Sequence, residues 1–239
     1  MMFKTNIGAA ADKEMVGYLR PETAQTIFVQ FKNIMSTYRM KIPFGVMQIG
    51  KAFRNEITPR QFLFRTREFT QMEMEFFCKK KEADALFLYW KDRRKEFYKV
   101  CGFSDDNIRF NDHKVDDLSH YSAATTDVEY LFPFGWKELE GIHSRSDFDL
   151  TQHQLYSKKK QQYFDNDIDP ATGKPYGNYV PYVVETSIGL DRMFLLILSN
   201  AFEEEIIPKE DGTTDSRTVL HIPVKLAPVK LAKIGRAHV

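Results

Sequence analysis

The sequence is poor in cysteine and in long apolar runs, and it has almost no net charge. Its two cysteines, Cys78 and Cys101, form no CxxC pair, which argues against a disulfide framework or a zinc ribbon. Lysine plus arginine (34) nearly equals aspartate plus glutamate (33), which excludes a highly basic nucleic-acid coat and predicts no DNA partner. No apolar run approaches the ~20 residues of a membrane-spanning helix, and the first residues lack the apolar segment of a signal peptide. These absences predict a cytoplasmic protein with no membrane partner.

Several common ligand motifs are also missing. Neither GxGxxG nor GxxxxGK[ST] occurs, so Rossmann and P-loop nucleotide binding have no support. The six histidines show no metal-ligand spacing. The acidic run 165–169 has the spacing of a calcium loop, but Pro170 and Tyr176 stand where glycine and glutamate are needed.

The 239 residues, 43% of them hydrophobic, are enough to bury the core of one large domain. Apolar residues at three- and four-residue spacing predict helices over 23–39, 83–101 and 190–200. Strands are expected at 46–56, 67–78, 127–131, 136–142 and 180–187, and a turn-rich loop at 165–176. The order of these elements predicts an α+β fold, in which helices flank a mostly antiparallel sheet.

The first two predicted strands form a hairpin with polar residues at alternate positions. Arg54 and Glu56 share a face of one strand, and the partner strand presents Arg67, Phe69, Gln71, Glu73 and Glu75. Arginine forks suit a phosphate, an aromatic ring suits a stacked base, and carboxylates suit an amine. This pattern predicts a site for a nucleotide and an amino compound. The alternative is an exposed edge hairpin with ordinary cross-strand ion pairs.

Two further segments carry candidate residues. Glu185 and Ser187 share a strand face, and Arg192 follows in the first turn of a helix, where the dipole disfavours a cation unless an anion is near. An Arg192 that reaches a surface carboxylate is the alternative. Glu138 and Glu140 are predicted to share one strand face, where carboxylates beside phosphates hold Mg²⁺. A solvated acidic face is equally compatible with that pair.

Three segments in this order resemble the three motifs of class II aminoacyl-tRNA synthetases. They are the helix over 23–39 before Pro43, the stretch from Phe53 to Phe69, and Gly189–Arg192. More narrowly, the chain resembles the dimeric-type glycyl-tRNA synthetases, on the strings YLRPETAQ, QIGKAFRNEITPRQFLFRTREFTQMEMEFF, WKELEGIHSRSDFDL and ETSIGLDR. The resemblance implies the class II catalytic fold and a homodimer that uses ATP with Mg²⁺, glycine and tRNA(Gly).

The resemblance also implies roles for individual residues. Arg54 and Arg192 would be catalytic, Phe69 would stack on the adenine, and Glu138 would help hold Mg²⁺. The implied ATP-binding residues are Arg54, Asn55, Glu56, Phe64, Arg65, Thr66, Arg67, Glu68, Phe69, Glu138, Leu139, Gly189, Leu190, Asp191 and Arg192. The implied glycine-binding residues are Glu22, Phe69, Thr70, Gln71, Met72, Glu73, Glu185, Thr186, Ser187, Ile188 and Gly189.

The chain departs from the family pattern in a few places. We expect residues 1–219 to form the catalytic core, beginning inside that domain, and residues 220–239 to start an anticodon-binding domain. Residues 234–239 do not match the expected continuation. Thr26 stands where glycine is expected, and Asn111 where a basic residue is expected, which would weaken contacts to ATP or tRNA.

Three other functions stay open at this point. A class II synthetase for another small amino acid would share most of these residues. A synthetase-like binding protein would bind ATP or an amino acid without catalysis. An amide ligase would pass an aminoacyl-adenylate to an acceptor other than tRNA.

Overall fold

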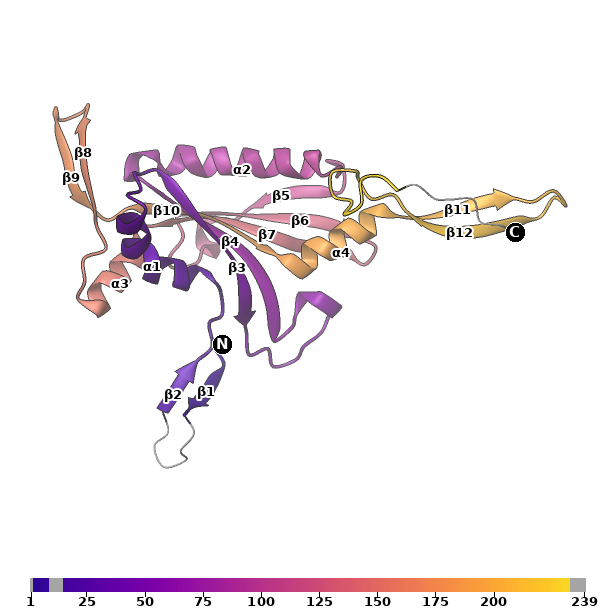
Figure 1. Ribbon diagram of the computed structural model, residues 1–239, viewed down its shortest axis with the longest axis horizontal. Coiled ribbons are helices and arrows are strands. Elements are labelled where there is room, and N and C mark those ends of the chain that lie inside the picture. Colours follow the sequence, from indigo (N-terminus) through magenta and orange to yellow (C-terminus); the bar gives the residue numbers. More distant parts are fainter. Residues whose placement is uncertain (1, 9–14, 233–239) are drawn as a thin grey trace.

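The computed structural model describes residues 2–8 and 15–232, so the predicted unusual tail at 234–239 lies outside the described residues. At its centre lies an antiparallel sheet in the order β3-β4-β10-β7-β6-β5 (Figure 1). The strands are β3 (Phe44–Phe53), β4 (Glu68–Cys78), β5 (Ile108–Asp112), β6 (Ala124–Phe132), β7 (Gly135–Ser146) and β10 (Tyr182–Gly189). The predicted α+β class is confirmed.

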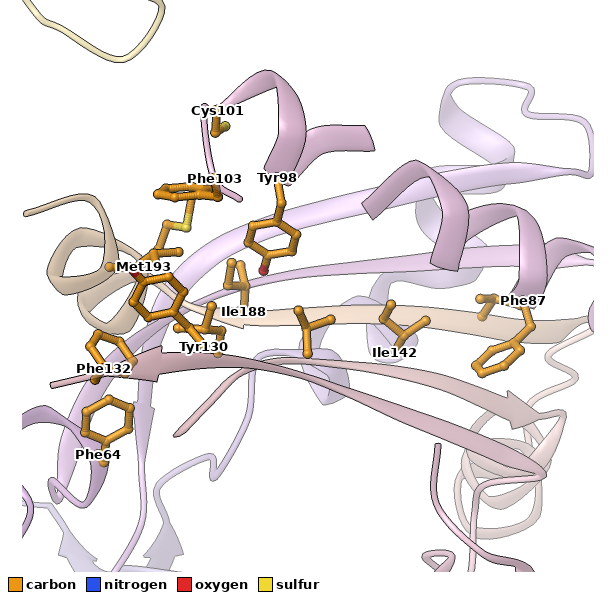
Figure 2. Packing of buried hydrophobic residues seen from close by; sticks show 14 of the residues in the cluster. Phe64, Phe87, Tyr98, Cys101, Phe103, Tyr130, Phe132, Ile142, Ile188 and Met193 are labelled. Carbon is orange, nitrogen blue, oxygen red and sulfur yellow. The ribbon is translucent and has the colours of Figure 1, made fainter. Parts of the chain in front are cut away.

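Helices cover both faces of this sheet. α1 (Ala24–Thr37) and α3 (Phe148–Ser157) lie on one face, and α2 (Ala83–Val100) and α4 (Leu190–Ala201) on the other. Alternation along β10 decides which side chain meets which helix: Val183 packs in the cluster with α1, whereas Val184 and Ile188 pack in the cluster with α2 and α4. Figure 2 shows the second cluster, with Tyr98 directed from α2 toward the sheet. Among the described residues, no helix is both long and apolar enough to span a membrane.

The apolar stripe of α1 is buried within this chain. Ile27, Phe28 and Phe31 are at most 2% exposed, and Phe31 packs against Phe44 and Phe77. The stripe therefore supplies the core on the α1 side of the sheet.

Three two-stranded hairpins leave the central sheet. They pair β1 (Lys4–Ile7) with β2 (Met15–Tyr18), β8 (Tyr163–Asp169) with β9 (Lys174–Tyr179), and β11 (Phe202–Pro208) with β12 (Thr214–Leu220). The β8–β9 and β11–β12 hairpins project at opposite ends of the molecule in Figure 1. The predicted loop over 165–176 was wrong, because β8 and β9 include most of it and only residues 170–173 lie between the two strands. Most of its polar residues face solvent along a hairpin that has no fully buried face, although Asp165 is buried.

The long connection between β3 and β4 begins earlier than predicted. β3 ends at Phe53 rather than at residue 56, because the Glu56 amide turns back and donates to the Arg54 carbonyl at 2.8 Å. A short 3-10 turn, η1 (Phe62–Phe64), then brings Phe64 into the core beside Phe132. Two more such turns, η2 (Lys80–Glu82) and η3 (Val115–Asp117), precede α2 and β6.

Candidate active site

A polar cavity of about 300 Å³ opens on the α1 side of the sheet. Its floor comes from β4, β7 and β10, and its rim comes from the chain after β3, the segment before α1 and the start of α4. This volume is at the lower limit of small-molecule sites. The cavity brings together residues that lie more than 100 positions apart, among them Glu22, Arg54, Glu73, Glu138, Glu185 and Arg192.

One end of the cavity is positive. The Arg54 Nε donates to the Pro21 carbonyl at 3.1 Å, and its guanidinium lies 5.2 Å from the centre of the Phe69 ring. Among the described residues, no carboxylate forms an ion pair with Arg54. The segment before α1 thus fixes the direction of this side chain while its charge stays available for an anion.

Arg192 lies at the same end, in the first turn of α4 as predicted. Its guanidinium donates to the carbonyls of Glu138 (2.9 Å) and Phe64 (3.1 Å). Burial lowers the pKa of Arg192, and the neighbouring positive charge of Arg54 lowers it further. The Glu138 carboxylate, 3.4 Å away and half exposed, offsets part of this cost. An anion between the two arginines would relieve their repulsion and the unfavourable helix dipole.

The opposite end of the cavity is negative. The Glu73 carboxylate accepts hydrogen bonds from the hydroxyls of Thr23 and Ser187, the second at 2.9 Å. It is 1% exposed, so burial raises its pKa, and the charge of Glu185 raises it further. Glu22 and Glu185 line the same end, so an ammonium there would meet carboxylates on several sides.

A buried arginine, Arg145, organises this negative end. It is 1% exposed, and it donates to both oxygens of Asp149 at 2.8 and 3.0 Å, to Glu185, and more distantly to Glu22 at 3.4 Å. The guanidinium also lies 4.2 Å from the centre of the Tyr121 ring. Arg145 therefore holds Glu185 in place and neutralises only part of the negative charge around it.

Glu185 favours its ionised form although it is buried. Burial alone would raise its pKa, but the contact with His143 (3.4 Å) and the charge of Arg145 outweigh burial and lower it to about 2. Burial disfavours the charged form of His143, yet the Glu185 carboxylate raises the pKa of that imidazole.

The sequence patterns missed several residues of the cavity. His143, which lines the cavity, and Arg145, which is buried beside it, were not predicted, although both lie at alternate positions with Gly141 on the floor strand β7. A side chain at Gly141 would lie 2.4 Å from the His143 ring, so the glycine gives that ring its space. The chain between β5 and β7 adds a His113–Asp127 pair, 2.8 Å apart. The period-two pattern of 141–145 was the available signal for the first group.

The predicted site residues fall into two sets. The cavity lining includes Glu22, Arg54, Glu56, Phe64, Thr66, Phe69, Thr70, Gln71, Glu73, Glu138, Leu139, Glu185, Ser187, Gly189, Asp191 and Arg192. Asn55, Arg65, Arg67, Glu68, Met72, Thr186, Ile188 and Leu190 do not line it. Met72 and Ile188 pack in the core on the opposite face of the sheet, because neighbours in a strand alternate between faces. Asn55 and Arg65 line a neighbouring cavity of about 420 Å³, which also contacts Arg54 and Glu56.

The expectation that Glu138 and Glu140 share a strand face was wrong. A bulge opposite Val128 and Glu129 interrupts the alternation of β7 at this point. Glu140 is buried toward α2, where it accepts a hydrogen bond from Tyr98 (2.7 Å) and pairs with Arg94 (2.6 Å). Only Glu138 faces the cavity.

Glu138 alone is compatible with the predicted magnesium ion. Mg²⁺ in nucleotide sites keeps several waters and takes one or two carboxylates plus phosphate oxygens. In the described part of the chain, no group of three or more acidic, histidine or cysteine side chains is arranged as a metal site. The residues present therefore fit an ion that arrives with a phosphate ligand.

The two departures from the family pattern lie outside the cavity lining. Thr26 is in α1, where its hydroxyl donates to the Thr23 carbonyl at 2.7 Å and accepts from Arg20 at 3.1 Å. Asn111 is exposed on the edge strand β5.

Comparison with known proteins agrees with this geometry. Residues 3–201 match the family described as the tRNA synthetase class II core domain (G, H, P, S and T). Curated proteins named glycine–tRNA ligase are similar over 97% of this chain: 50% identical in Caldanaerobacter subterraneus, 52% in Geobacillus kaustophilus and 50% in Clostridium perfringens. The chain spans about half (48%) of the length of each of these relatives.

A solved structure shows the same fold at low sequence identity. Prolyl-tRNA synthetase of Giardia lamblia, in complex with prolyl-adenylate, matches with a TM-score of 0.60 over 82% of this chain and 36% of that one. The sequences are 17% identical, so this likeness shows the fold alone.

Proposed function

Because the chain belongs to the class II core-domain family of tRNA synthetases, we propose that it carries the catalytic core of a glycine–tRNA ligase. The reaction would join glycine to ATP as glycyl-adenylate, release pyrophosphate, and pass glycine to the 3′ end of tRNA(Gly). The names of the curated relatives support glycine among the amino acids of the family.

One observation carries this proposal: a single cavity has a positive end at Arg54 and Arg192 and a negative end at Glu22, Glu73 and Glu185. A phosphate at the first end and an ammonium at the second would place an amino acid carboxylate between them. That is the arrangement needed for attack of the carboxylate on the α-phosphorus of ATP.

The residues of this chain would act by position and charge. Arg54 would stabilise the charge that develops on the α-phosphate as the new phosphorus–oxygen bond forms and pyrophosphate leaves. Phe69 and Arg192 would hold the adenine, and Glu56 would accept a hydrogen bond from its amine. Glu138 would hold Mg²⁺, which supplies charge neutralisation for the phosphates.

Glycine would be selected by charge and by lack of space. Glu73, held by Thr23 and Ser187, and Glu185, held by Arg145, are rigid acceptors for an ammonium. Glycine has no side chain, so the site can bind only its ammonium and carboxylate groups. Exclusion of larger amino acids is then steric.

The wider setting is also proposed. Both cysteines are buried and unpaired, which suits a reducing cytoplasm. The edge strand β3 exposes Met47 (73%) and Ile49 (61%), which supports a homodimer through this edge rather than through the α1 stripe. Sedimentation of the chain and of Ile49→Lys would test that interface.

Amino-acid-dependent ATP–pyrophosphate exchange tests the proposed reaction. We expect exchange with glycine and none with alanine or serine, and we expect Arg54→Ala to abolish it. Exchange with alanine or serine would keep the class and refute glycine. A folded chain that binds ATP without exchange would instead indicate a catalytically silent binding protein. Transfer of glycine to an acceptor other than tRNA would indicate an amide ligase.

A further inference from the structure

Glu75 is a buried carboxyl group that the proposed reaction leaves unused. It lies on β4, two residues beyond Glu73 on the same face, and opposite Glu185 in the β4–β10 pairing. Its side chain is 0% exposed, and neither of its oxygens has a hydrogen-bond partner among the described residues. An ionised carboxylate in such a place is strongly disfavoured.

The acidic groups around Glu75 add to the free-energy cost of its ionisation. Glu185 faces it from β10, Glu73 from β4 and Asp149 from α3, and all three are acidic. Arg145 on β7 is a cation that favours its ionisation, but all three guanidinium nitrogens of Arg145 already donate to other carboxylates.

The residues that β3 and α1 place near Glu75 bring no charge. β3 places Val46 opposite Glu75, and α1 presents Ala24, Ile27 and Phe28 to this face of the sheet. Burial, and next the charge of Glu185, therefore raise the pKa of Glu75 well above its ordinary value.

Resting on the proposed function, we propose that Glu75 holds a proton while the amino-acid end of the cavity is empty and releases it when an ammonium binds there. Glycine would bring one positive charge to the carboxylates of Glu73 and Glu185, directly beside Glu75. That charge favours the ionised form of Glu75, so its carboxyl O–H proton passes to the solvent. In this step the O–H bond of Glu75 breaks and a solvent water accepts the proton, and no other bond changes.

Because the protonation of Glu75 is coupled to ammonium binding, the negative charge of the site increases when the positively charged ligand is bound. With Glu75 neutral, the empty cavity avoids one buried negative charge. With Glu75 ionised, the ammonium gains another carboxylate beneath the two that line the cavity. Glu75 is thus a positioning residue for the charge of the substrate and does not touch the reacting atoms.

Infrared difference spectroscopy tests the protonation directly. The parent chain at neutral pH should show the carbonyl band of a protonated carboxyl group, and saturating glycine should reduce it. Glu75→Gln, which has the shape of the neutral acid, should fold and lack the glycine-sensitive band. Glu140→Gln is the matched control, because Glu140 is equally buried but faces α2 with Tyr98 and Arg94, so the glycine-sensitive band should remain.

Kinetics provide an independent readout. Proton release on binding requires the KM for glycine in the exchange reaction to rise as pH falls, approaching tenfold per pH unit where Glu75 is protonated. In Glu75→Gln the KM should be higher at neutral pH and should lose this dependence. A glycine-sensitive band that persists in Glu75→Gln, or an unchanged pH profile, would overturn the proposal.

The two proposals fail in different ways. Absence of exchange with glycine in the folded parent chain would refute the proposed function, and with it the release of a proton on glycine binding. Exchange with glycine together with a protonated-carboxyl band that glycine does not change would refute only the role of Glu75.

Discussion

Replacement of Arg145 by methionine should destabilise the protein more than any loss of an exposed charge. The side chain is 1% exposed, and its removal leaves Glu185 (3% exposed) and Asp149 (6% exposed) without their common cation. Breaking a buried ion pair from one side costs about 3–5 kcal/mol. For a chain of this size, that loss lowers the melting temperature by roughly 6–20 °C.

The penalty should depend on pH in a defined direction. The folded-state pKa of Glu185 is lowered to about 2, so its pairing stabilises the parent above the ordinary carboxyl pKa of 4.5. That stabilisation is lost as pH falls from 4.5 toward the lowered pKa. The difference between parent and Arg145→Met should therefore be full at pH 7 and shrink on acidification below pH 4.5.

Urea unfolding followed by circular dichroism at pH 7 and at acidic pH measures both quantities. Lys51→Met is the matched control, because it removes one cation from the exposed Lys51–Glu68 pair on β3 and β4. That change should cost at most about 1 kcal/mol. Equal losses in the two variants at pH 7, or a difference that stays constant in acid, would refute the role given to Arg145.

Three further changes should have separable effects. Phe77→Ala should cost about 3–5 kcal/mol in thermal unfolding, because the ring is fully buried against the rings of α1 and β3, and a loss under 1 kcal/mol would contradict that packing. Tyr98→Phe should cost about 1–3 kcal/mol by removing the hydroxyl that donates to buried Glu140, and equal stability to the parent would show that Glu140 does not need it. Thr23→Val removes a donor that lowers the pKa of Glu73, so the KM for glycine should rise most at low pH, and a pH-independent change would argue against this mechanism.

The long apolar periodicities predicted most of the fold. The helices around α1, α2 and α4, and the strands around β3, β4, β6, β7 and β10, appear within a few residues of their predicted bounds. These predictions are correct because each of these helices and strands buries one face against the sheet or against a helix. The β8–β9 hairpin was predicted as a loop because strands without a fully buried face show no such alternation.

The candidate site was predictable only in part. Alternation along β4 correctly places Phe69, Gln71 and Glu73 on one wall of the cavity. The same rule failed for Glu138 and Glu140, because a bulge depends on the pairing between strands and leaves no mark in the local pattern. Arg145 was not predicted as a site residue because its importance depends on tertiary contacts. Its ion-pair partners come from β10, from α3 and from the segment before α1.

The position of β10 between β4 and β7 has a consequence for how the protein is made. The β3–β4 and β6–β7 pairs join neighbours in the sequence, whereas β10 is the last strand of the sheet to be synthesised and the one that joins the two halves. Until residue 189 is available, Glu73 on β4 and Arg145 on β7 have no strand between them. A nascent chain shorter than this carries two separate ribbons with unpaired inner edges and polar groups meant for a closed interior. The amino-acid end of the cavity is therefore completed late in synthesis. A chaperone that shields these strand edges on the nascent chain would have to remain bound until β10 emerges.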